Sequence, residues 1–102
     1  MNLVDQYRLL VSGYYGIREI DDYNLKEYVL KDVENYIKDF IRLYPIEDYD
    51  YQKEAEELEN SDIKTKLQDA LLVLNKINGS IELILLIKKR INEINEQEML
   101  EI

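Results

Sequence analysis

The side chains with the most chemical potential in this chain are carboxylates, and they are concentrated between Glu47 and Asp62. This stretch carries eight acidic residues and one basic residue, whereas residues 63–102 carry six of each. Most of the formal net charge of −9 therefore lies in a short part of the chain. Grouped carboxylates can hold a divalent cation, or they can steer a basic partner toward the surface that carries them.

A calcium site is the first possibility that this stretch raises. The spacing of its oxygen-bearing side chains resembles positions 1, 3, 5, 9 and 12 of a calcium-binding loop, filled here by Asp48, Asp50, Gln52, Glu56 and Glu59. However, Lys53 stands where such a loop needs a turn glycine, and it places a positive charge in the site. We therefore expect no calcium at this position.

Paired glutamates raise the second possibility, a magnesium site. Carboxylates three residues apart share a helix face, and on facing helices such pairs could hold Mg²⁺, as in a Mg-dependent all-α nucleotide hydrolase. The pairs are Glu54/Glu57, Glu56/Glu59 and Glu93/Glu96. The last pair lies on a polar helix end, where exposed acids are typical, so we expect neither a metal nor another cofactor.

Two residue types are missing altogether. The chain has no Cys, which excludes disulfides, thiol nucleophiles and zinc thiolate sites, and it has no His, which removes the commonest general base and metal ligand. No glycine-rich phosphate loop or Gly-x-Ser-x-Gly nucleophile motif is present. The sequence therefore favours a protein that binds and does not catalyse.

A binding surface fits the acidic stretch best, because tyrosines are interleaved with its carboxylates. Tyrosine is enriched at binding hot spots, and acids around it would attract a basic surface. The predicted partner-binding residues are Glu47, Asp48, Tyr49, Asp50, Tyr51, Glu54 and Glu57. Tyr14 and Tyr15 form a predicted secondary contact patch; the alternative is a ring pair folded onto the end of the core.

The leading hypothesis is a small acidic inhibitor, immunity-type or antitoxin-type factor that binds a basic protein partner, such as a toxin or a nucleic-acid-handling protein. One alternative is a structural adaptor or homodimer built through residues 81–101, and others are a DNA mimic and the magnesium-dependent hydrolase. Direct nucleic-acid binding and membrane binding are disfavoured by the acidic balance. We expect a cytoplasmic protein, because the N-terminus lacks the features of a signal peptide.

The elements that must position these residues are helices. Apolar residues recur at helical spacing, and three Gly and one Pro leave little turn chemistry for an all-β fold. The sequence predicts a single all-α domain over residues 1–102, a small antiparallel helical bundle. Its main helices are expected at about 2–12, 25–44, 62–78 and 81–98, with a short helix at about 51–59.

The boundaries rest on local signals. The pair 63–78 and 81–97 is the most apolar part and is predicted to be the scaffold hairpin, with Gly79 at positive φ and Ser80 as a cap. Asn24 is the predicted cap of the second helix. Gly13 predicts a break after the first helix, although that helix could run to Ile20. A break is expected at 60–62; the alternative is one kinked helix over 51–78.

Overall fold

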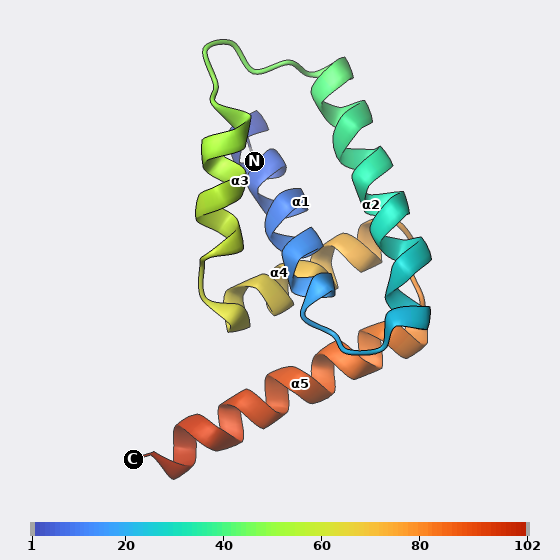
Figure 1. The fold of residues 1–102 in the computed structure, drawn as a ribbon, viewed down its shortest axis with the longest axis vertical. Coiled ribbons are helices and arrows are strands. Elements are labelled where there is room, and N and C mark those ends of the chain that lie inside the picture. Colours follow the sequence, from blue (N-terminus) through green and yellow to red (C-terminus); the bar gives the residue numbers. More distant parts are fainter. Residues whose placement is uncertain (1, 102) are drawn as a thin grey trace.

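The computed structural model describes residues 2–101 and confirms an all-α fold (Figure 1). No strand occurs in that part of the chain. Its five helices are α1 (Leu3–Arg18), α2 (Tyr23–Leu43), α3 (Tyr51–Glu59), α4 (Ile63–Lys76) and α5 (Ile81–Leu100).

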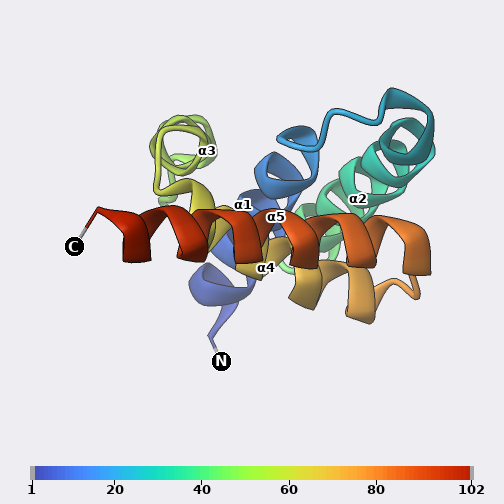
Figure 2. The same ribbon diagram turned by 90° about the horizontal axis from the view of Figure 1, so that it is seen from below.

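The central element is α1. Seen from below, α4 covers one side of α1, while α2 and α3 flank its other side (Figure 2). The helices α4 and α5 form the expected hairpin; α4 passes behind α1, and α5 crosses below one end of the other helices (Figure 1). The prediction that this hairpin is the scaffold is wrong. The main partner of α4 is α1, on which it packs most extensively, and its contact with α5 is much smaller.

The core lies where α1 and α4 meet, and α2 and α5 close it. Side chains with no exposed area come from all four helices: Ile17, Val33, Leu67, Ala70, Val73, Leu74, Leu83 and Ile87. Together with the other buried apolar residues they form one continuous cluster. Burial of this apolar surface is the main force that holds the short helices together, since isolated helices of this length are marginal in water.

The first helix continues past its predicted end at residue 12. Gly13 and Gly16 lie inside α1 and are buried. They are there because α1 and α4 approach closely: a Cβ on Gly16 would lie 2.1 Å from the backbone oxygen of Lys66. These glycines therefore serve helix packing and do not mark a break.

The second helix begins two residues earlier than predicted. Its cap is Asp22, whose carboxylate accepts a hydrogen bond from the backbone N–H of Leu25, so the prediction of Asn24 as the cap is wrong. Aspartate and asparagine cap equally well, and the sequence offers both within three positions. The helix ends at Leu43, just before Pro45.

The turn between α4 and α5 differs from the prediction in one residue. Asn78, not Gly79, has the left-handed conformation, with φ of 53°. Asparagine tolerates this region better than most residues. Gly79 donates its N–H to the carbonyl of Leu74 at 2.8 Å, and a Cβ there would crowd the Leu74 side chain at 2.6 Å.

The prediction of Ser80 as a cap and of the break at 60–62 is confirmed. Asp50, Asp62 and Ser80 each accept a hydrogen bond from a first-turn N–H of the helix that follows. The helix α3 ends at Glu59 and α4 begins at Ile63, so residues 51–78 are not one helix. Among the helices that the structure describes, none is both long enough and apolar enough to cross a bilayer.

Candidate interaction surface

The acidic stretch separates its two residue types between the inside and the outside of the molecule. The rings of Tyr49 and Tyr51 turn inward and meet Tyr7 of α1 in three edge-to-face contacts. The ring centroids lie 5.5 Å apart for Tyr7 and Tyr49, 5.0 Å for Tyr7 and Tyr51, and 5.1 Å for Tyr49 and Tyr51. Such contacts add to the stability that burial itself gives.

Hydrogen bonds fix this tyrosine cluster to the backbone. The Tyr7 hydroxyl donates to the carbonyl of Tyr51 at 3.1 Å, and the Tyr51 hydroxyl accepts from the N–H of Ile46 at 2.8 Å. Burial raises the pKa of Tyr7 to about 12, because a charged phenolate would lose its hydration there. The packed rings and their hydrogen bonds therefore hold the loop that connects α2 to α3 against α1.

The carboxylates of the same stretch mostly remain at the surface. Glu47, Asp48 and Glu57 are exposed and have no hydrogen bond or ion pair within residues 2–101. Asp50 is exposed and caps α3, and Glu54 forms an ion pair with Arg8 of α1. We call the three unpaired residues, Glu47, Asp48 and Glu57, the acidic face.

The structure thus divides the predicted partner-binding residues into three groups, of which Asp50 and Glu54, engaged within the molecule, are one. The acids Glu47, Asp48 and Glu57 are available to another molecule, whereas Tyr49 and Tyr51 are only partly exposed and pack on Tyr7. The rings therefore support the surface from beneath. The sequence reasoning missed Tyr7 as their partner, although its place on the apolar face of the first helix marked it as a core residue.

The predicted secondary patch, Tyr14 and Tyr15, lies in an open groove between α2 and α3. The two rings meet edge to face, with centroids 5.5 Å apart, and both are partly exposed. The groove has a volume of about 380 Å³, and α1 forms its floor. Its lining residues are Tyr7, Val11, Tyr14 and Tyr15 from α1, Glu34, Ile37 and Lys38 from α2, and Ala55 from α3.

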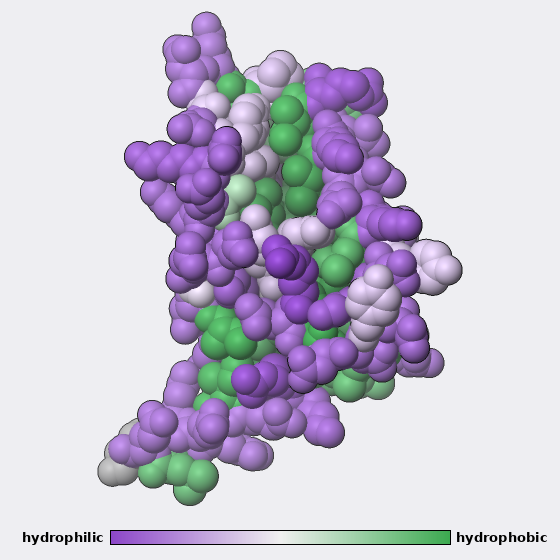
Figure 3. Space-filling model, in the orientation of Figure 1, coloured by the Kyte–Doolittle hydropathy of each residue, from purple (hydrophilic) through white to green (hydrophobic). Residues whose placement is uncertain are grey.

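The groove is visible on the surface as a strip of pale and green side chains between two hydrophilic flanks (Figure 3). The flanks are α3 and α2, which both pack on α1 but make little contact with each other. On the α2 wall, Glu34 accepts a hydrogen bond from the Tyr14 hydroxyl at 2.7 Å. Burial and this hydrogen bond raise the pKa of Tyr14 to about 12.

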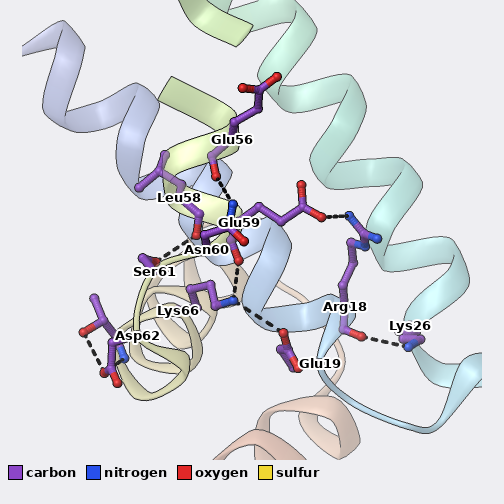
Figure 4. Close-up of polar contacts among 11 residues, drawn as sticks. Arg18, Glu19, Lys26, Glu56, Leu58, Glu59, Asn60, Ser61, Asp62 and Lys66 are labelled. Atoms are coloured by element: carbon purple, nitrogen blue, oxygen red, sulfur yellow. Dashed lines mark hydrogen bonds and ion pairs between the residues drawn. The ribbon is translucent and has the colours of Figure 1, made fainter. Parts of the chain in front are cut away.

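A cation already rests on one of these rings. The Arg18 guanidinium lies over the ring of Tyr15, 5.4 Å from its centroid, and 3.9 Å from a carboxylate oxygen of Glu59. Glu59 and Glu56 extend from α3 on the side that faces α2 (Figure 4). Burial raises the pKa of Tyr15, and the nearby charge of Glu59 adds to the effect.

Near the C-terminal ends of α1 and α3, a buried lysine of α4 connects the three helices. The Lys66 ammonium of α4 donates to the backbone carbonyl of Glu59 at 2.8 Å and pairs with the Glu19 carboxylate at 3.4 Å (Figure 4). Only 5% of Lys66 is exposed, and its partners lie at the ends of α3 and α1. This ammonium therefore holds the C-terminal end of α3 in place, a role that no pattern in the sequence predicts.

The carboxylates of the described residues form no cluster that could bind a metal ion. Among residues 2–101, no group of three or more acidic side chains lies close enough to hold a metal ion. The homodimer predicted through residues 81–101 would need apolar side chains of α5 at the surface, but two of its isoleucines lie against the protein's own core: Ile87 is fully buried and Ile94 is 9% exposed.

Comparison with protein-family models, with curated proteins and with solved structures finds no match for this chain.

Proposed function

We propose that this protein is a small, acidic, non-catalytic binding protein that occupies a basic surface of a protein partner, in the manner of an inhibitor, immunity-type or antitoxin-type factor. The observation that carries the proposal is the acidic face. Three carboxylates lie exposed and unpaired on a loop and helix that the inward-packed tyrosine cluster holds in place.

Charge segregation supports the proposal. Residues 47–59 carry seven acids and only one base, Lys53, whereas α2 carries four of each. Opposite potentials across an interface speed encounter and disfavour wrong partners. The rigid tyrosine cluster beneath these carboxylates also favours binding, because carboxylates that are already in position lose less conformational freedom when a partner binds.

The test is affinity capture from a native lysate at several salt concentrations, with two matched triple variants. One variant neutralises the acidic face (Glu47→Gln, Asp48→Asn, Glu57→Gln). The control removes the same charge from unpaired exposed acids elsewhere (Asp32→Asn, Glu96→Gln, Glu101→Gln). We expect the wild type and the control to retain the same basic protein at low salt and to release it as salt rises, because salt screens exposed charges.

The first variant should lose that protein at every salt concentration. Equal retention by both variants would show that overall charge, and not the acidic face, attracts the partner. Failure of the wild type to retain any basic protein at low salt would overturn the proposed function.

A second function, a structural adaptor or homodimer built through α5, is favoured by one observation. Ile81 is 74% exposed and Leu85 59% exposed, and they lie one turn apart on the same helix. The solution mass measured over a range of concentrations tests this function, and a mass that stays that of one chain would dispose of it.

A further inference from the structure

We propose that the groove between α2 and α3 receives an arginine-bearing segment of the basic partner, with its guanidinium on the rings of Tyr14 and Tyr15 and beside Glu34. This inference rests on the proposed function and names the second part of the same binding surface. Ala55 of α3 lines the groove, and Glu57 lies two residues farther along the same short helix, on its opposite side, so only the width of α3 separates the groove from the acidic face.

The shape of the groove suits a single long side chain and its backbone. Its floor consists of tyrosine rings and Val11, and Ile37 adds apolar surface from α2. A volume of about 380 Å³ is at the lower end of the range for ligand pockets. An arginine can bury its aliphatic stem on such a floor while its planar head stacks on a ring.

Charge complementarity selects a cation. Glu34 stands on the α2 wall, and Glu56 and Glu59 extend from α3 on the side that faces α2 (Figure 4). Among the lining residues themselves, Glu34 is the single acid and Lys38 the single base, so the excess of negative charge comes from Glu56 and Glu59 beside the groove. Glu34 and the neighbouring acids of α3, together with the acidic face beyond α3, favour a positively charged guest over a neutral or negative one.

The chain itself shows which cation this arrangement holds. Arg18 lies over Tyr15 and beside Glu59 at the lower end of the groove, so one guanidinium is already bound between a tyrosine and an acid. Tyr14 and Glu34 form a second pair of the same kind farther along α1. In this second pair the carboxylate accepts only from the tyrosine hydroxyl, and no cation lies on it within residues 2–101.

The test uses a synthetic peptide of about a dozen residues, in which arginines alternate with alanine and leucine, titrated into ¹⁵N-labelled protein and followed by amide chemical shifts. Matched peptides carry glutamine or glutamate in place of arginine. We expect the arginine peptide alone to shift the amides of Tyr14, Tyr15 and Glu34. Equal shifts with the glutamine peptide, or larger shifts with the glutamate peptide, would overturn the choice of guest.

Variants locate the contact. Glu34→Gln should weaken binding of the arginine peptide about five- to tenfold, since it removes one charge-assisted contact. The control Asp32→Asn removes the same charge from an exposed position on α2 that does not line the groove, and it should change binding less than twofold. An equal effect of both substitutions would reduce the groove to a general charge effect and overturn the inference.

Tyr14 supplies a second readout, which a merely structural role would not give. Tyr14→Phe keeps the ring and frees Glu34 from its hydrogen bond, so binding should be unchanged or tighter. Tyr14→Leu removes the ring and should weaken binding about fivefold, with thermal unfolding confirming that the variant is folded. Weaker binding by Tyr14→Phe than by Tyr14→Leu would refute stacking on the ring.

The two proposals can fail separately. If a captured partner is lost by the variant of the acidic face and retained fully by Glu34→Gln and Tyr14→Leu, the proposed function stands and the groove is not its second part. If the arginine peptide shifts the groove amides but no basic protein is captured, the groove binds guanidinium and the proposed function is wrong.

Discussion

The contact between α1 and α4 at Gly16 gives the sharpest test of the fold. A Cβ built on Gly16 would lie 2.1 Å from the backbone oxygen of Lys66 and 2.6 Å from its carbonyl carbon. A backbone carbonyl inside a helix cannot rotate away as a side chain can. Gly16→Ala must therefore push the two helices apart by about 1 Å, which is a large displacement in a close-packed interior.

The size of the effect follows from two opposed terms. Overpacking costs about 1–3 kcal/mol where neighbours can adjust, and a rigid backbone contact belongs at the upper end of that range. Alanine is better than glycine inside a helix by about 1 kcal/mol, and this gain offsets part of the loss. We therefore expect a net loss of about 2 kcal/mol in the free energy of unfolding, or on the order of 10 °C in Tm.

Gly13→Ala is the matched control, because Gly13 lies in the same helix and gains the same helix preference. Its Cβ would meet a methyl group of Val73 at 2.5 Å and the backbone oxygen of Asp69 at 3.0 Å, so the backbones of the two helices must separate much less than at Gly16. We expect its stability to stay within about 1 kcal/mol of the wild type. Urea unfolding followed by circular dichroism measures both variants. Gly16→Ala as stable as Gly13→Ala would refute the close packing of α1 on α4.

Three further predictions concern the polar groups beneath the candidate surface. Tyr7→Phe removes the hydrogen bond to the Tyr51 carbonyl and should lower the free energy of unfolding by about 1 kcal/mol, measured in urea. Lys66→Met keeps the apolar stem but leaves the Glu59 carbonyl without its ammonium donor. Thermal unfolding should therefore show a free energy of unfolding about 2 kcal/mol lower than that of the wild type. Tyr7 and Tyr14 have a pKa of about 12 in the folded state against 10.0 without the fold, so between these values the unfolded chain loses protons that the folded chain keeps. Stability should therefore fall as pH rises from 10 to 12, and tyrosinate absorbance should reveal late-titrating tyrosines that titrate normally once urea unfolds the chain.

The number of helices and their approximate positions could be predicted from this sequence, because the helical spacing of apolar residues and the capping residues agree. Ser80 is a predictable cap, and the break at 60–62 is predictable because polar residues that compete with helical hydrogen bonds interrupt the apolar period there. The end of α1 could not be placed, because a glycine that terminates a helix and a glycine that admits a neighbouring backbone look alike in one sequence.

The same ambiguity affected the choice of scaffold. The concentration of apolar residues points to residues 63–97, but the most extensive helix contact, between α1 and α4, depends on two small residues of α1, Gly13 and Gly16, which carry no hydropathy signal of their own. Helix–helix distance is set by the smallest residues at the contact as well as by the largest. Counting apolar residues alone therefore could not identify α1 as the central helix.

The candidate surface shows what charge and aromatic patterns can and cannot predict. Exposed carboxylates were predictable, because burying an unpaired charge is costly and a stretch with eight acids and one base cannot pair them internally. The fate of the tyrosines was not, because an amphipathic ring can serve equally well as an outward anchor or as an inward support. Tyr7 decides between these roles by offering Tyr49 and Tyr51 a ring to pack on.

This inward packing moves the aromatic part of the candidate surface from the acidic stretch to the groove. Tyr49 and Tyr51 are committed to Tyr7, so the partly exposed rings beside α3 that remain free of this cluster are those of Tyr14 and Tyr15. A partner that touches the acidic face can therefore reach aromatic surface only by passing over α3 into the groove. The two halves of the surface are thus joined through one nine-residue helix, whose position depends on the tyrosine cluster at its start and on Lys66 at its end.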